Sequence, residues 1–187
     1  MNNQKNTIVA VVIIIAVIII AGFICKGTMR GIAEEEAAIA VSNYAESFQP
    51  KTFGFGAAWE KEFSYAQGVK TGNMIFVAGQ LAHGQEVDEN GMPEFLMGGF
   101  EQQLRASLDN VKAVLASYGA TMDDVVFLQN FVDAEAGGNM AGDYYPVFAR
   151  VISEYFPKGL HAMTIAEVVD LFGPLQLVES NAIAVIR

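Results

Sequence analysis

The sequence predicts an α+β domain in which one sheet is backed by two helices, with one transmembrane helix ahead of it. Short apolar runs bounded by glycine or polar residues are typical of strands. Two longer segments carry apolar residues at helical spacing, and each has a single apolar stripe to bury. A continuous apolar run precedes them all. The order β-β-α-β-α-β-β is most simply one sheet with both helices on the same face.

The strands are predicted from their apolar runs and turn residues. Residues 65–70 and 73–80 flank Thr71-Gly72, so they form a hairpin. Residues 83–91 form a polar loop, and His83 within it is expected at the surface. The remaining strands are expected at residues 125–133, 161–169 and 175–186.

Two helices are predicted between these strands. The first covers residues 98–118, and its apolar stripe consists of Phe100, Leu104, Leu108, Val111 and Leu115. The second covers residues 143–156, with Asp143 as its N-cap and Pro146 in its first turn. Its buried face is expected to contain Tyr144, Phe148, Val151, Ile152 and Tyr155.

Residues 7–25 are predicted to be a transmembrane anchor, which makes the protein a single-pass membrane protein. The run contains no charge, and its length is close to the ~20 residues that a helix needs to cross a bilayer. A long signal peptide is the alternative. The side of the membrane on which the domain lies is left open, because Lys5 before the run is balanced by Lys26 and Arg30 after it.

Residues 26–59 are predicted to be a partly helical linker. Residues 32–48 are rich in Ala and Glu and indicate a helix, which Gln49-Pro50 ends. The Gly- and aromatic-rich segment 52–59 either docks on the domain or forms a loop, and its composition favours the loop. Residues 60–187 are then the folded domain.

Charge and composition exclude some functions. The net charge is −10, with 11 Lys and Arg against 21 Asp and Glu, so the domain lacks the basic stripe of a nucleic-acid-binding protein. The single cysteine, Cys25, cannot form an intrachain disulfide. The two histidines have no companion ligands at metal-site spacing, so neither a metal nor another cofactor is expected.

Four strings, in order along the chain, carry a resemblance to a known family. They are YAQGVKTGNMIFVAGQ, QLRASLDNVKAVLASYGATMDDVV, DYYPVFARVISEYFPKG and NAIAVIR. Residues 60–187 therefore resemble the RidA/YjgF family, whose members are homotrimers of a chorismate-mutase-like fold. The family hydrolyses reactive enamines and imines to keto acids and ammonia, in clefts between subunits. The resemblance thus implies self-association and a small-molecule ligand.

The resemblance also implies which positions form the cleft, and this chain differs at two of them. The family phrase PARTxVEV corresponds to HAMTIAEV, so Met163 stands where the family has its substrate-binding arginine, while Thr164 is retained. A thioether cannot hold a carboxylate as a guanidinium does. The glutamate of EAIA is replaced by Asn181, which can orient a water molecule but is a poor base. Tyr65 and Gly79 remain as cleft residues.

Candidate catalytic residues are accordingly Tyr65, His161 and Asn181. His161 is two residues from Met163 on the same strand face, although a partly exposed residue at a strand start is the simpler interpretation. The ligand cleft is predicted to contain Tyr65, Gly79, Met163, Thr164 and Asn181. Three functions stay open: an altered imine deaminase, a non-catalytic module that binds a small metabolite, and a structural trimer in a membrane assembly.

Overall fold

The computed structural model describes residues 29–133, 140–159, 161–173 and 175–187. The chain divides into two units, residues 1–49 and residues 50–187. In the first unit, helix α2 (Met29–Ser47) confirms the helix predicted at 32–48, and it ends before Pro50, whose ring disfavours helical geometry in the preceding residue.

The predicted location in a membrane has to be corrected. Within the described residues, no helix combines the length and the apolar character that crossing a bilayer requires. The run 7–25, on which the prediction of a single-pass membrane protein rested, lies outside those residues. We therefore withdraw the membrane location.

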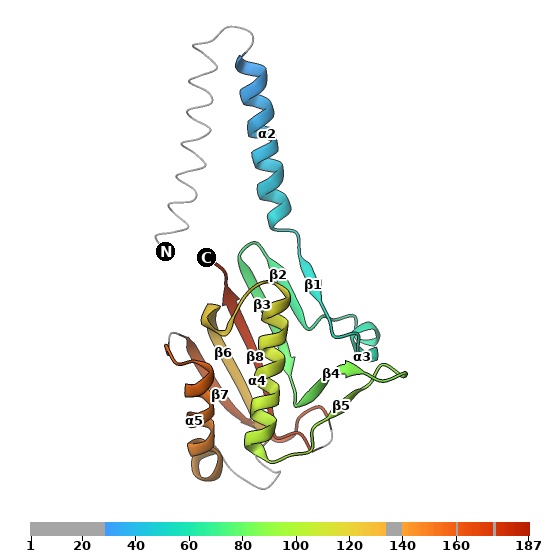
Figure 1. Cartoon of the computed structure of the whole chain (residues 1–187), viewed down its shortest axis with the longest axis vertical. Helices are drawn as coiled ribbons and strands as arrows, with labels where there is room; N and C mark the ends of the chain where they lie inside the picture. Colours follow the sequence, from blue (N-terminus) through green and yellow to red (C-terminus); the bar gives the residue numbers. More distant parts are fainter. Residues whose placement is uncertain (1–28, 134–139, 160, 174) are drawn as a thin grey trace. The chain divides into compact units, whose positions relative to one another are not determined.

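The second unit is built on a six-stranded sheet in the order β1-β2-β3-β8-β6-β7 (Figure 1). Its strands are β1 (Lys51–Phe53), β2 (Gly68–Thr71), β3 (Met74–Gln80), β6 (Val125–Asp133), β7 (Ala162–Val168) and β8 (Val178–Val185). Neighbouring strands are antiparallel except β6 and β7, which are parallel and joined through a helix. The predicted hairpin is confirmed, because Thr71 pairs with Met74 across a turn in which Gly72 has φ 58°.

Helices α4 (Phe100–Ser117) and α5 (Tyr145–Tyr155) cover one face of the sheet (Figure 1). The predicted stripe of α4 is fully or nearly fully buried, and Leu104 and Leu108 have no exposed surface. In α5, Phe148, Val151 and Ile152 are buried as predicted. These side chains form the core with the sheet residues that alternate toward the helices, such as Ile75, Leu128, Val178 and Ala182.

Several local predictions were wrong. The polar loop at 83–91 contains strand β4 (His83–Val87), which pairs with β5 (Pro93–Phe95) in a separate hairpin. Segment 52–59 docks on the domain, because β1 extends the sheet and Phe53 and Phe55 pack against the core. Helix α5 begins at Tyr145 with no side-chain cap, so Asp143 is not its N-cap. The final strand begins at Val178, later than predicted.

A second stripe of α4 is polar and buried. Ser107 Oγ donates to the carbonyl of Gln80 (2.8 Å), and Asn110 Nδ2 donates to the carbonyls of Leu81 (3.1 Å) and His83 (2.9 Å). Gln103 lies one turn before Ser107 on the same side of the helix. The stripe therefore holds the connection between β3 and β4, which leaves the sheet and would otherwise lack partners for its backbone.

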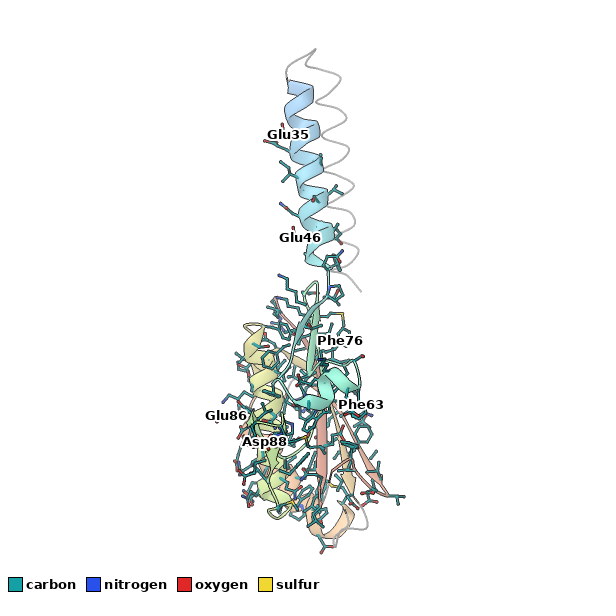
Figure 2. The ribbon with its side chains drawn as sticks, turned by 90° about the vertical axis from the view of Figure 1, so that its right-hand side faces the viewer. Glu35, Glu46, Phe63, Phe76, Glu86 and Asp88 are labelled. Atoms are coloured by element: carbon teal, nitrogen blue, oxygen red, sulfur yellow. The ribbon has the colours of Figure 1, made fainter. Side chains whose placement is uncertain are left out.

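The opposite face of the sheet is covered by no described helix. Side chains alternate on β8, so Glu179, Asn181 and Ile183 point to this open face while their neighbours are buried. Phe76 of β3 pairs with Ile183 and is 40% exposed (Figure 2). Phe127 and Phe131 of β6 are also only partly buried. The open face is thus a mixture of apolar and polar groups that no described helix covers.

Candidate functional site

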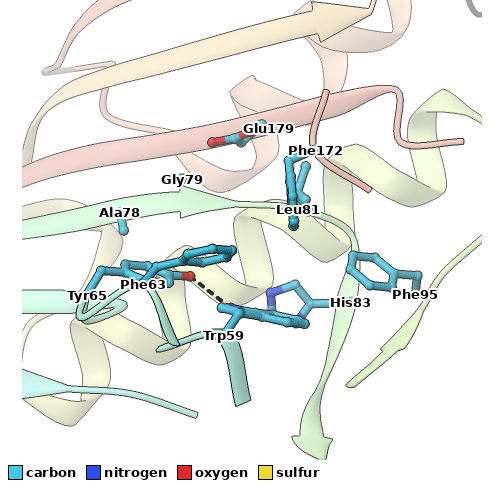
Figure 3. Close-up of a pocket in the computed structure, with 10 residues that line it drawn as sticks. All are labelled: Trp59, Phe63, Tyr65, Ala78, Gly79, Leu81, His83, Phe95, Phe172 and Glu179. Atoms are coloured by element: carbon cyan, nitrogen blue, oxygen red, sulfur yellow. Dashed lines mark hydrogen bonds between the residues drawn. The ribbon is translucent and has the colours of Figure 1, made fainter. Parts of the chain in front are cut away.

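A cavity of about 490 Å³ lies at the end of strand β3, beside helix α3 (Ala58–Glu62) (Figure 3). Five aromatic side chains line it: Trp59, Phe63, Tyr65, Phe95 and Phe172. The other lining residues are Ala78, Gly79, Leu81, His83 and Glu179. Two predicted cleft residues, Tyr65 and Gly79, therefore belong to this cavity, and one carboxyl group faces it.

Tyr65 is fixed by a short chain of hydrogen bonds. Its hydroxyl oxygen accepts from Trp59 Nε1 (3.0 Å, Figure 3) and from Gln67 Nε2 (3.0 Å). Because the hydroxyl oxygen is the acceptor in both bonds, its proton can be donated to a ligand in the cavity. Burial raises the pKa of Tyr65, so the phenol stays protonated at neutral pH. The group is thus a positioned hydrogen-bond donor on the cavity wall.

Helix α3 is held in place by Glu60. Its carboxylate accepts from the backbone nitrogens of Phe55 (2.9 Å) and Gly56 (3.1 Å), and from Gln67 Nε2 (3.0 Å). The backbone nitrogen of Tyr65 donates to the carbonyl of Glu60 (2.9 Å) after a left-handed turn at Ser64 (φ 53°). This short helix and its exit turn therefore place Trp59 and Tyr65 on the cavity together.

Glu179 supplies the cavity's carboxyl group from the adjacent strand β8. A Cβ atom at Gly79 would lie within 1.6 Å of Glu179 Oε1, so only glycine lets the carboxyl lie across β3 at this point. The ladder between β3 and β8 is irregular between Val77 and Gln80, which places Gly79 at a bulge. Burial raises the pKa of Glu179, since desolvation disfavours the charged form.

His83 forms the floor of the cavity rather than a surface residue. It is only 5% exposed, which corrects the sequence prediction. Its Nδ1 donates to the carbonyl of Gly84 (2.6 Å), and its ring meets Trp59 and Phe95 edge-on at about 6 Å. Burial lowers the pKa of His83, so the ring is neutral at pH 7 and adds no positive charge to the site.

Buried glutamines hold the loops around the cavity. Gln103 of α4 donates to the carbonyls of Gly98 and Leu175 (both 2.9 Å) and accepts from the backbone nitrogen of Leu177 (2.8 Å). Gln176 accepts from the backbone nitrogen of Ala82 (2.9 Å). The segment that carries Phe172 is thereby tied to α4 and to the end of β3.

The other predicted cleft residues lie outside this cavity. Asn181 follows Glu179 by two residues and shares the open face with it. Thr164 belongs to the same row across the sheet, because it pairs with Gln129, which pairs with Asn181; Asn181 Nδ2 donates to Gln129 Oε1 at 3.4 Å. Met163 points to the opposite face on the edge strand β7 and is 42% exposed.

His161 is also on the helix side of the sheet. Its ring lies 4.1 Å from that of Phe156, at the end of α5, and burial lowers the pKa of His161. Met163 and His161 therefore lie on the same side of the sheet, as predicted, but away from Tyr65 and Gly79. Within the described residues, no three His, Cys, Asp or Glu side chains lie close enough to share a metal ion.

Sequence reasoning missed Glu179, Trp59 and Phe172. Glu179 lies two residues before Asn181, but the family pattern predicted a cleft residue at Asn181 and not at Glu179. The pairing of a glycine at 79 with a glutamate one strand away could be recognised only once the register of β3 and β8 was known. Trp59 was assigned to the linker side of the domain boundary.

Comparison with known proteins identifies the family of the chain. The family model described as endoribonuclease L-PSP matches residues 56–186. A RutC family protein of Pyrococcus abyssi is 32% identical over 124 residues, covering 64% of this chain and 84% of that protein. A protein of Dermatophagoides farinae named 2-iminobutanoate/2-iminopropanoate deaminase is 30% identical, covering 57% of this chain and 74% of its own.

The fold agrees with a solved structure as well. The YjgF gene product of Escherichia coli superposes with a TM-score of 0.58 at 28% identity, covering 73% of this chain and 99% of that one. The family match covers β2 to β8 and includes every residue that lines the cavity. The chain therefore belongs to the RidA/YjgF family.

Proposed function

We propose that the protein hydrolyses a reactive imine or enamine at the cavity of Tyr65 and Glu179. One observation carries the proposal: a protonated phenol and a carboxyl group with a raised pKa face the same aromatic cavity. A carboxyl whose pKa moves toward neutrality can both accept and return a proton, as general acid–base catalysis requires. The deaminase name of a relative adds support.

The two groups have distinct roles in this reaction. Water adds to the carbon of an iminium group, R₂C=NH₂⁺, while the Glu179 carboxylate takes its proton. Glu179 then returns the proton to the nitrogen of the carbinolamine. As the C–N bond breaks and the C=O bond forms, the hydroxyl proton passes through Glu179 to the departing ammonia, so a carbonyl compound and ammonium remain. The Tyr65 hydroxyl donates a hydrogen bond to the carbinolamine oxygen.

The test is hydrolysis of a small panel of imines by the full-length protein. N-Benzylidenemethylamine is followed by its ultraviolet absorbance, and 2-iminopropanoate is generated from alanine by an amino acid oxidase. We expect a rate above that in buffer for at least one substrate, reduced about 10²-fold or more by Glu179→Gln and about tenfold by Tyr65→Phe. Glu86→Gln is the matched control, since it removes the same charge from an exposed strand (Figure 2). No turnover of any imine would refute the proposal.

We also propose that the protein is a homotrimer whose open sheet faces pack against one another. The supporting observation is the exposed apolar surface of Phe76, Phe127 and Ile183, which no described part of the chain covers. Such a surface marks an interaction site. Light scattering should give three times the subunit mass, and Phe76→Glu should lower it. An unchanged mass for this variant would place the interface elsewhere.

The site is proposed to be of an arginine-lacking type. Met163 occupies the position of the family arginine and points away from the open face, so it cannot substitute for a guanidinium. This observation also favours a second candidate function, a non-catalytic module that binds a small metabolite in the same cavity. Thermal stabilisation by a metabolite, without turnover of any imine, would support the module over the enzyme.

A further inference from the structure

We infer that the cavity recognises an organic cation, an iminium or alkylammonium group with a small apolar body, rather than an anionic imino acid. The inference takes the cavity as the site of the proposed hydrolysis and names the class of its substrate. Binding can be measured without turnover, so the two proposals can fail separately. Three features of the cavity carry the argument.

The first feature is the density of aromatic rings around one opening (Figure 3). Trp59 and Phe95 lie 6.0 Å apart and Phe63 and Phe172 lie 6.3 Å apart, measured between ring centroids, and all four line the cavity with Tyr65. Ring faces carry negative electrostatic potential, so several rings around one space form a cage that attracts a cation. Phe63 and Phe172 are 58% and 70% exposed, so a ligand in the cavity would bury part of both rings.

The second feature is the carboxylate of Glu179. In the described part of the chain it makes no hydrogen bond and no ion pair, although it is partly buried. By contrast, Glu60 beside the same cavity is fully occupied with backbone and amide donors. A desolvated carboxylate without a partner is costly, and a bound cation would compensate it.

The third feature is the absence of positive charge. Among the described residues, no lysine or arginine lines the cavity, and His83 is held neutral by burial. A carboxylate ligand would therefore meet Glu179 with no positive side chain of the described residues to neutralise either group, and like charges in a partly desolvated space repel strongly.

The experiment compares three water-soluble probes of nearly equal shape. Choline carries a quaternary ammonium group, 3,3-dimethylbutan-1-ol is its neutral isostere, and 3,3-dimethylbutanoate is the anionic counterpart. Trp59 is the single tryptophan of the chain, so its fluorescence reports directly on the cavity. We expect choline to bind at least about tenfold more tightly than the alcohol, and the anion to bind weakest.

Two variants of Glu179 separate charge from folding. Glu179→Gln should remove the preference for choline over the alcohol, whereas Glu179→Asp should keep part of it. Glu86→Gln, at an exposed position of β4 that does not line the cavity, should leave the preference unchanged. Melting temperatures establish that each variant is folded.

Equal affinity for choline and the neutral alcohol, or a preference that survives Glu179→Gln in a folded protein, would overturn the inference. Hydrolysis of 2-iminopropanoate that depends on Glu179 would then still uphold the proposed function. Conversely, a Glu179-dependent preference for choline without turnover of any imine would uphold the cation site and refute the hydrolase.

Discussion

The two faces of the sheet contrast in how their side chains are satisfied. On the face under α4 and α5, the apolar side chains of the core are almost fully buried, and the polar groups Ser107 and Asn110 bond to backbone carbonyls. On the open face, Phe76 is exposed and the carboxylate of Glu179 has no hydrogen bond within the described chain. Groups without partners are what a ligand or another subunit can use.

The difference indicates that the covered face of the sheet provides stability, whereas the open face and the cavity are available for function. The covered face determines how strongly the domain is folded, because burial and satisfied hydrogen bonds dominate the free energy of unfolding. The open face and the adjoining cavity contribute little to that free energy and retain side chains that can change partners. Variants on the two sides should therefore affect different measurements.

The largest expected effect comes from breaking the covered face. Leu108→Ala removes a side chain with no exposed surface and leaves a cavity in the core. We expect the free energy of unfolding to fall by about 3 kcal/mol in urea denaturation. The same deletion at Leu175, which is 70% exposed, should cost less than about 0.5 kcal/mol. Similar losses for both would contradict the assignment of the core.

A smaller effect is expected from the polar stripe that links the covered face to the cavity. Gln103→Ala removes three hydrogen bonds to the loops at residues 98 and 175–177 and leaves part-buried backbone groups without these partners. We expect a loss of about 2 kcal/mol. Hydrogen exchange should also rise at Leu177. Gln102→Ala, one residue away and exposed, should change neither measurement.

Much of this fold could be predicted because the covered face has strong periodicity. Phe100, Leu104 and Leu108 recur at helical spacing, and the strands of the hairpin flank a recognisable glycine turn. Strand β4 was missed because Val87 is its single apolar residue, so it has no apolar alternation. Strand β1 was missed because its three residues are stabilised by pairing with β2 and not by local preference.

The site was harder to predict because its members meet only through sheet register and loop packing. Tyr65 and Gly79 were predicted from the family resemblance, because the family's cleft positions already reflect how its strands pair. Glu179 faces the cavity because β3 and β8 are neighbours and Gly79 has no side chain. No spacing within the sequence encodes that contact, which joins residues one hundred positions apart.

A third effect is expected at Gly79, which lies against Glu179 on the open side of the sheet. Gly79→Ala places a methyl group where Glu179 Oε1 lies, and the flexible carboxyl must swing away from the cavity. We expect choline affinity to fall about tenfold, while the free energy of unfolding falls by only about 1 kcal/mol. Gly99→Ala is the control, because its added Cβ meets nothing within 4 Å. Unchanged choline binding by Gly79→Ala would show that Glu179 does not hold the cation.

The smallest effect is expected on the outer surface of the helices, where charge pairs join α4 to α5. Glu101 accepts hydrogen bonds from Arg150 (2.6 and 3.0 Å) and Arg105 (3.0 and 3.1 Å), which lower the pKa of Glu101 to about 2. A carboxyl whose pKa is lowered by folding stabilises the protein above its ordinary pKa of 4.5, and this contribution disappears as the pH falls toward about 2.

Glu101→Gln should therefore lower the melting temperature by only about 1–2 °C at pH 7, because exposed ion pairs are screened by water. The difference from the unaltered protein should shrink between pH 4.5 and about 2, and added salt should reduce it at pH 7. Glu86→Gln removes the same charge from a site without these arginines and serves as the control. A difference that persists at pH 2 would mean that Glu101 acts through packing of its side chain and not through its charge.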